Sequence, residues 1–219
     1  MSRYYQGEGA RAYDRRYAHF THSTLSETLR LLDDATITRQ AQERGRPLRL
    51  LDVACGTGVL LSLLHKRFPE AELSGTDGSQ DMLALAHQRL KGIQGFRLEQ
   101  VVIGSSALAG LPYPSESFDL ITCTNALCTI PSDPVAVLTE LHRLLAPGGH
   151  LLLEDVAWRP PLFPWWLFQW LVRRAGAAPL HPYTQAEAHT LCEQAGLSIQ
   201  ASHTFVIGWL LRGWVMKVN

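Results

Sequence analysis

The sequence predicts an α/β fold with an open, largely parallel sheet. Short apolar runs alternate with helical patterns over the first 156 residues, and the first of these runs ends in a glycine-rich turn. Such alternation is typical of right-handed βαβ units. Residues 197–206 and 209–218 then read as two strands joined tightly around Gly208. Because a hairpin pairs its strands antiparallel, we expect a mixed sheet.

The expected elements are bounded by caps and turn residues. Ser23 is the expected N-cap of a helix over 23–44, which Gly45 ends, and Asp133 with Pro134 begins a later helix. The other expected strands are 48–54, 72–76, 96–103, 118–124 and 150–156, and the other helices are 60–68, 79–92, 134–145 and 184–196, the last with a capping box.

The composition is that of a single globular domain. Of the 219 residues, 46% are apolar and 18% are charged, so the chain can bury a core without disulfides or metals. Lys and Arg together number 20, as do Asp and Glu, and the net charge is zero. Because no overall positive field attracts nucleic acid, we expect no nucleic-acid partner.

The cysteines and histidines indicate neither a disulfide framework nor a metal site. Cys55, Cys123, Cys128 and Cys192 form no CxxC pair, and the nine histidines show no HExxH spacing. We expect buried, neutral thiols in a reducing compartment and no bound metal. The N-terminus lacks the apolar stretch of a secretory signal, and no apolar run reaches the roughly 18 residues of a membrane span. We therefore expect a cytoplasmic protein.

The turn after the first strand is the most informative part of the sequence. Ala54, Gly56 and Gly58 carry little or no side chain, so backbone amides can approach a ligand at the start of a helix. At the carboxyl edge of a parallel sheet, such a turn is where ligands bind in open α/β folds. It lacks both the third glycine of a GxGxxG dinucleotide fingerprint and the Gly-Lys-Ser/Thr of a Walker loop.

The segment DVACGTG at 52–58 resembles the first motif of the class I S-adenosylmethionine-dependent methyltransferases, with Ala54 in place of the commoner first glycine. Asp77 ends the second expected strand, where a carboxylate can accept hydrogen bonds from both ribose hydroxyls. The following GSQDML at 78–83 resembles the family's segment in which a methionine packs near the adenine.

Further segments carry the resemblance to residue 156. LPYP at 111–114, followed by SFDL at 117–120, is similar to the family's segment at the fourth strand. Asn125 falls where the family's backbone faces the methionine part of the cofactor, and LLAPGGHL at 144–151 resembles the segment before strand five. We interpret Asp119, inside a strand, as structural.

The resemblance implies a Rossmann-like class I methyltransferase fold, a seven-stranded mixed sheet of order 3-2-1-4-5-7-6 with helices on both faces. It implies one methyltransferase domain over 1–219: an N-terminal helical lid at 1–46, an S-adenosylmethionine-binding core at 47–156, and a substrate-wall insertion with the C-terminal hairpin at 157–219. The cofactor-binding residues it implies are Asp52, Ala54, Cys55, Gly56, Gly58, Asp77, Gly78, Met82, Ser105, Ser106, Asn125 and Ala126.

Two departures from the family pattern concern the adenine and the substrate. Where the family often has an aspartate for the adenine amino group, this chain has IGSSA at 103–107, so a hydroxyl of Ser105 or Ser106, or the backbone, must bind that group. The paired histidines frequent after the fourth strand are replaced by Cys128-Thr129-Ile130.

The sequence identifies no catalytic residue. Methyl transfer is an in-line displacement, which a protein assists by aligning the reactants and excluding water. A general base is needed only where the acceptor holds a proton at neutral pH. The candidates for such a base are His22, Asp155, His181 and Tyr183.

Two aromatic segments flank the expected core. The segment 157–183 contains four of the six tryptophans and no Asp or Glu. We rank its interpretations in the order substrate wall, dimer contact, core packing and membrane-surface helix, so membrane contact is the least favoured and a homodimer stays open. At the N-terminus, Tyr4, Tyr5 and Tyr13 resemble the entry segment that folds over the cofactor as a lid in small-molecule methyltransferases.

The predicted function is S-adenosylmethionine-dependent methyl transfer to a small lipophilic or aromatic molecule, and the resemblance is to the quinone-biosynthesis group in particular. One alternative is a non-catalytic S-adenosylmethionine-binding partner or regulatory subunit. A second is an NAD-dependent oxidoreductase. These hypotheses differ in the ligand that binds at the turn and in whether binding is followed by turnover.

Overall fold

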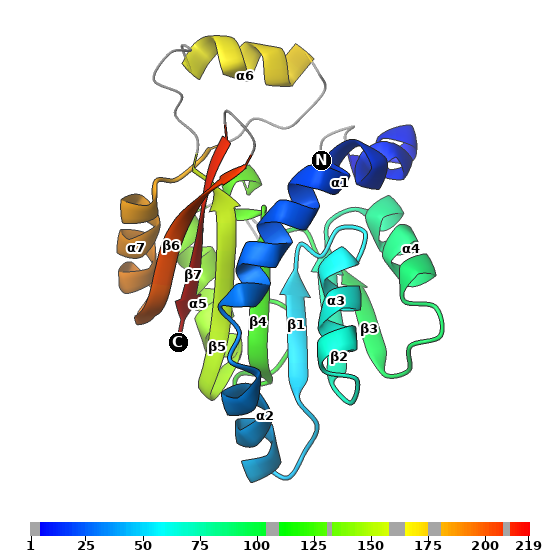
Figure 1. The fold of residues 1–219 in the computed structure, drawn as a ribbon, viewed down its shortest axis with the longest axis vertical. Coiled ribbons are helices and arrows are strands. Elements are labelled where there is room, and N and C mark those ends of the chain that lie inside the picture. Colours follow the sequence, from blue (N-terminus) through cyan, green and yellow to red (C-terminus); the bar gives the residue numbers. More distant parts are fainter. Residues whose placement is uncertain (1–4, 104–109, 131–132, 158–164, 175–180, 208–210) are drawn as a thin grey trace.

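A computed structural model describes residues 5–103, 110–130, 133–157, 165–174, 181–207 and 211–219. Its sheet has seven strands in the order β3-β2-β1-β4-β5-β7-β6 (Figure 1), which confirms the expected topology. The strands are β1 Arg49–Val53, β2 Glu72–Asp77, β3 Phe96–Gln100, β4 Phe118–Thr124, β5 Leu145–Val156, β6 Ile199–Ile207 and β7 Leu211–Val218. The helices are α1 Gly7–Arg30, α2 Asp34–Glu43, α3 Val59–Arg67, α4 Gln80–Arg89, α5 Pro134–Leu144, α6 Trp165–Arg174 and α7 Gln185–Gln194, with a short 3₁₀ turn η2 at Leu127–Thr129.

Strands β1 to β5 pair in parallel, and β7 runs antiparallel between β5 and β6. The carboxyl ends of the parallel strands therefore meet at one edge of the sheet, toward the top of Figure 1. Their amino ends meet at the opposite edge. All helices except α6 cover one face or the other of this sheet.

The sheet divides the core into two apolar layers. Because side chains alternate along a strand, Leu50, Leu120 and Leu152 belong to the layer with α1, α2, α3 and α4, which we call the α1 face. Leu51 and Ile121 belong to the opposite layer, which α5 and α7 cover. Near-continuous apolar strands are what a sheet buried on both faces requires.

The prediction of one helix over 23–44 is wrong in two respects. The N-terminal helix α1 already begins at Gly7, so Ser23 lies inside it, and its hydroxyl donates to the backbone oxygen of His19 at 2.9 Å rather than capping a helix. The chain then leaves the helical path, and Asp33 caps a separate helix by accepting hydrogen bonds from Thr36. The sequence does not reveal the break between the two helices, because both pack on the same core layer and the apolar pattern therefore continues from one into the other.

The bounds of two strands also differ from the prediction. Strand β5 begins at Leu145, not at residue 150, and pairs with β4 on both sides of an irregularity between Phe118 and Leu120. The Pro-Gly-Gly sequence thus lies within the irregular start of the strand. Strand β3 ends at Gln100 instead of continuing to Ile103, and the backbone beyond it borders a cavity.

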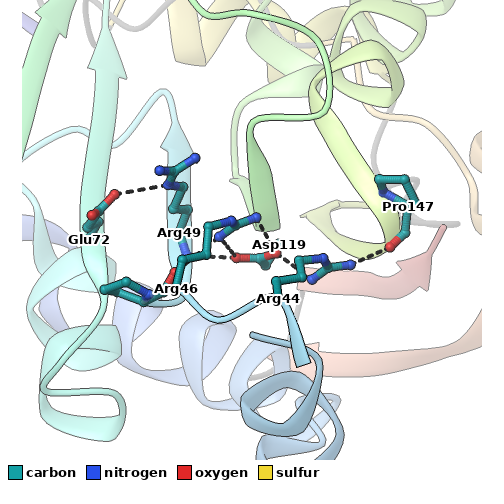
Figure 2. A network of polar contacts seen from close by, with 7 residues as sticks. Arg44, Arg46, Arg49, Glu72, Asp119 and Pro147 are labelled. Carbon is teal, nitrogen blue, oxygen red and sulfur yellow. Dashed lines mark hydrogen bonds and ion pairs between the residues drawn. The ribbon is translucent and has the colours of Figure 1, made fainter. Parts of the chain in front are cut away.

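An ion-pair network around the buried Asp119 joins the amino ends of β1, β2 and β4 (Figure 2). The Asp119 side chain is fully buried and accepts hydrogen bonds from Arg44 at 2.6 Å, from Arg46 at 2.7 and 2.9 Å, and from the backbone N–H of Arg49 at 2.9 Å. Arg49 in turn pairs with Glu72 at 3.0 Å. Asp119 therefore anchors the loop that enters β1, in agreement with the structural role predicted for it.

The four cysteines are buried and form no disulfide. Burial raises the thiol pKa of all four, to about 11 for Cys192 and further for the others, so the neutral form predicted for them dominates near neutrality. In the described part of the chain, no helix has the length and apolar character needed to cross a bilayer.

Candidate functional site

A cavity of about 580 Å³ lies at the carboxyl edge of the sheet, bordered by β1, β2 and β4 below and by α1 above. Its volume is within the range of small-molecule sites. The residues that line it come from α1 and the residue before it, from the strand ends and the loops that follow them, from the starts of α3 and α4, and from the loop before α7: Tyr5, Tyr13, Asp14, Thr21, Leu25, Asp52, Ala54, Cys55, Gly56, Thr57, Val59, Leu60, Asp77, Gly78, Met82, Val101, Val102, Ile103, Thr124, Asn125, Ala126, Thr129, Ile130 and His181.

The glycine-rich turn has the backbone geometry that its sequence predicts. Gly56 and Gly58 have φ of +54° and +75°, and Ala54 adopts the same left-handed region at +58°, which is uncommon for a residue with a Cβ. A Cβ at Gly58 would come within 3.0 Å of Ala86 in α4, whereas one at Gly56 would meet no atom within 4 Å. Gly58 therefore permits close helix packing, and Gly56 leaves its backbone open toward the cavity.

Asp77 fixes the shape of this turn from the end of β2. One carboxylate oxygen accepts the backbone N–H of Gly56 at 2.9 Å, and the other accepts that of Ser79 at 2.7 Å. A carboxylate offers about four acceptor positions, so Asp77 keeps capacity for further donors from the cavity. Burial raises its pKa above the ordinary value, and the two N–H groups partly oppose that rise.

Asp52 lies beside Asp77 at the end of β1. Its side chain is buried and accepts a hydrogen bond of 2.7 Å from the hydroxyl of Thr122, the residue that pairs with it on the adjacent strand β4. Burial, to which the charge of Asp77 adds, raises the pKa of Asp52 to about 7. Among the described residues no Lys or Arg pairs with either carboxylate, so this edge of the cavity attracts cations and hydrogen-bond donors.

An apolar slot adjoins Asp77. We use this name for the part of the cavity lined by Met82, at the start of α4, and by Val101, Val102 and Ile103, which follow β3. Such a slot suits a flat, weakly polar ring. Ser105 and Ser106 lie outside the described residues.

Asn125 connects the end of β4 with β5 and α1. Its φ is +52°, and its backbone N–H donates to the Glu154 carbonyl at 2.8 Å. Its side-chain amide donates to the Glu154 carboxyl group at 2.7 Å and to the Thr24 hydroxyl at 3.1 Å. Burial, followed by the charge of Asp155, raises the pKa of Glu154 well above its ordinary value. The sequence did not lead us to Glu154 or Thr24. For Glu154, the one available indication was its place beside Asp155 near the end of β5.

Helix α1 is held over the cavity by polar contacts to the opposite wall. Asp14 accepts a hydrogen bond from the Thr57 hydroxyl at 2.6 Å and pairs with Arg89 at 2.5 Å. Arg89 also donates to the Thr57 hydroxyl at 2.8 Å, and the Gly7 N–H donates to Asp81 at 2.8 Å. This latch, made of Asp14, Thr57 and Arg89, closes one side of the cavity. The sequence analysis named Tyr5 and Tyr13 of the same wall but not the latch.

Of the four candidate bases, the structure brings only His181 to the cavity wall. The backbone N–H of His181 donates to the Cys128 carbonyl at 2.7 Å, which holds it beside the loop after β4. Asp155 is fully buried and accepts the N–H groups of Cys128 and Val156 at 2.7 Å each. His22 is exposed on α1, and Tyr183 packs against the α5-side core layer. These three do not line the cavity.

Most of the residues expected around the cofactor come together in this one cavity. Asp52, Ala54, Cys55, Gly56, Asp77, Gly78, Met82, Asn125 and Ala126 line it, and Gly58 lies directly behind the turn without lining the cavity itself.

The chain is similar in sequence to known methyltransferases over its central part. Residues 50–149 match a family model described as a methyltransferase domain. A demethylmenaquinone methyltransferase of Thermus thermophilus is 40% identical over 109 residues, which are 50% of this chain and 47% of the relative. The chain spans about half the length of such curated relatives.

Solved structures show the same fold. An S-adenosylmethionine-dependent methyltransferase from Mesorhizobium loti covers 78% of this chain, and 90% of its own length, with a TM-score of 0.63 at 20% identity. The geranyl diphosphate C-methyltransferase of Streptomyces coelicolor, solved with S-adenosylhomocysteine, has a TM-score of 0.62 at 13% identity and covers 86% of this chain and 77% of its own. Residues 50–149 thus match a methyltransferase domain, and the fold is that of S-adenosylmethionine-dependent methyltransferases of known structure.

Proposed function

On the basis of this methyltransferase domain, we propose that the chain transfers a methyl group from S-adenosylmethionine to a small lipophilic or aromatic molecule. The observation that carries the proposal is the single cavity in which an acceptor-rich turn, an apolar slot and the left-handed Asn125 adjoin. A nucleoside attached to a charged amino-acid tail needs an apolar surface for its base, acceptors for its ribose hydroxyls and polar groups for its tail. The polar and apolar groups of the cavity therefore fit the cofactor.

The cofactor's parts correspond to separate residues of the cavity. Asp77 would accept the ribose hydroxyls, since each of its oxygens already accepts one N–H and has a further lone pair. Met82 and the residues after β3 would pack on the adenine. Gly56 would let backbone approach the methionine part, and the Asp52 carboxylate suits its cationic ammonium group.

When bound, S-adenosylmethionine supplies a methyl group on a positively charged sulfur, which an acceptor atom can displace in line. The chain contributes alignment and exclusion of water. Helix α1 acts as the lid, held by the latch of Asp14, Thr57 and Arg89. Glu154 and Thr24 fix Asn125 between the turn and the acceptor side of the cavity.

The acceptor side is formed by Thr21 and Leu25 of α1, by Thr129 and Ile130, and by His181. Apart from the imidazole, this wall offers two hydroxyls and two aliphatic side chains, a setting for a lipophilic or aromatic molecule with few polar groups. The relatives named demethylmenaquinone methyltransferases support a substrate of that class. His181 is the candidate base for an acceptor that must lose a proton.

Calorimetric titration with S-adenosylmethionine, S-adenosylhomocysteine and NAD tests the cofactor, and turnover on a panel of quinols, phenols and amines tests the reaction. We expect heat from the first two ligands, none from NAD, and methyl transfer to at least one quinol or phenol. Heat without turnover on any acceptor would favour a non-catalytic binding subunit. Heat from NAD alone would favour the oxidoreductase.

A further inference from the structure

Helix α6 presents tryptophans to the outside of the molecule. Trp166 and Trp170 are 70% and 48% exposed, and they rank among the few large exposed apolar side chains of the described residues. Their spacing of four residues places them on one side of the helix. Exposed apolar surface of this kind marks a contact with a partner or a lipid surface.

The same side of α6 is cationic. Arg173 and Arg174 are exposed and follow Trp166 by seven and eight residues, which puts them next to the tryptophans on the helix surface. The guanidinium of Arg174 lies 4.8 Å from the ring centroid of Trp170. The sequence from 157 to 183 contains no acidic residue, so nothing in that stretch offsets the positive charge.

Helix α6 lies apart from the described elements that border the cavity. Figure 1 shows the helix beyond the carboxyl ends of the parallel strands, at the end of the molecule where α1 begins. None of its described residues lines the cavity. Arg212, at the start of β7, is exposed at this end too, as is its strand partner Val206. Within the segment 157–183, the described residue that lines the cavity is His181, which lies outside α6.

Charge favours an anionic lipid surface over a second copy of the chain. A symmetric contact through this side of α6 would set each Arg173–Arg174 pair against its own copy, since the same patch meets itself across a twofold axis. An anionic bilayer instead complements the arginines. Its headgroup region is also where tryptophan is enriched in proteins that lie on membranes.

We propose that α6 is an interfacial helix that docks the protein on an anionic lipid bilayer, with Trp166 and Trp170 in the headgroup region and Arg173 and Arg174 on lipid phosphates. Docking would hold the cavity end of the molecule toward the membrane. A lipophilic acceptor concentrated in the bilayer would then reach the cavity without crossing bulk water. The docking itself depends on no assumption about catalysis.

The test is co-sedimentation of the full chain with vesicles of phosphatidylcholine alone and of phosphatidylcholine mixed with phosphatidylglycerol. We expect binding to the mixed vesicles that weakens as salt is added. Replacing Trp166 and Trp170 by Ala, or reversing the arginines in R173E/R174E, should lower the partition coefficient about tenfold or more. Circular dichroism and thermal melting verify that the variants fold.

The matched control is K66E/K91E, which makes the same change of charge at exposed lysines near the amino edge of the sheet. It should bind the mixed vesicles like the wild type. The proposal is overturned if the wild type binds neutral and mixed vesicles equally or not at all, or if the control loses as much binding as R173E/R174E. A lipid-free dimer that the tryptophan variant dissociates would assign α6 to a protein contact and also overturn it. Because vesicle binding and cofactor heat are separate measurements, failure here leaves the proposed function untouched.

Discussion

The two edges of the sheet hold buried carboxylates in opposite electrostatic settings. At the amino edge, Asp119 is held by two guanidinium groups and a backbone N–H (Figure 2). At the carboxyl edge, Asp52 has a hydroxyl and Asp77 has two backbone N–H groups, and neither forms an ion pair with a described residue. All three acids end or begin a central strand.

This difference distinguishes an acid that stabilises the fold from acids that are available to a ligand. An acid whose charge is neutralised within the fold holds chain segments together, and little of its acceptor capacity is left for a ligand. An acid that is buried without a cation keeps a raised pKa and an unmet demand for donors. The carboxyl edge therefore carries an energetic cost that a bound cationic or hydroxyl-rich ligand would offset.

The largest expected effect is on stability at the amino edge. Replacing Asp119 by Ala leaves Arg44 and Arg46, whose side chains are 24% and 21% exposed, without their partner. Breaking such a pair costs about 3–5 kcal/mol of unfolding free energy. Urea denaturation measures it. The control Glu72→Ala removes the exposed pair with Arg49 and should cost less than about 1 kcal/mol; equal losses would contradict the comparison.

At the carboxyl edge, replacing a carboxylate should change the affinity for the cofactor. Asp77→Ala is expected to weaken S-adenosylmethionine binding by about 1.5–3 kcal/mol, the scale of hydrogen bonds to a charged group. Titration calorimetry measures the change. Glu72→Ala is again the control, since it removes a carboxylate from the other end of the same strand and should leave affinity unchanged. An unaltered affinity in the Asp77 variant would refute its assignment to the ribose.

Asp52 should make the ligand-free protein less stable as the pH rises. Its pKa is about 7 in the folded chain and about 4 in an unfolded one, so between these values the folded state holds a proton that the unfolded state has lost. Stability therefore falls from about pH 4 to about pH 7 and stays reduced above that.

The isosteric Asp52→Asn removes this titration. We expect the unfolding free energy of the variant to exceed that of the wild type by about 1–3 kcal/mol near pH 8 and to match it near pH 4. Urea denaturation across that range, without cofactor, is the measurement. Parallel pH profiles for the two proteins would show that Asp52 is already ionised at low pH.

The smallest expected effect concerns the latch on α1. Asp14→Ala removes the contacts to Thr57 and Arg89, but the Asp14 side chain is 41% exposed, so solvent screens the pair. We expect a loss of cofactor affinity of about two- to fivefold, mostly as faster dissociation, measured by stopped-flow displacement. Glu43→Ala, which removes an exposed pair with Arg39 on α2, should not change the rate. Equal rates in all three proteins would mean that α1 does not act as a lid.

Local pattern was sufficient for the sheet and for the turn. Apolar runs placed the central strands, and the small residues at 54, 56 and 58 predicted backbone that approaches a ligand. The same reasoning failed at the N-terminus, where one apolar pattern spans α1 and α2. For the aromatic insertion the sequence pattern left several interpretations open, because such a pattern does not reveal which way a helix faces.

By itself the sequence determined the order of strands and helices, the glycine-rich turn and the carboxylate of Asp77, since these depend on neighbours within a few residues. Tertiary structure alone decided which distant groups meet. Arg89 lies 75 positions from Asp14, and Thr24 lies 101 positions from Asn125. It also decided that Asp119 is neutralised by arginines while Asp52 is not. Those pairings arise because α1 crosses the sheet and because the loop before β1 approaches Asp119. A local sequence pattern does not contain information on such contacts between distant parts of the chain.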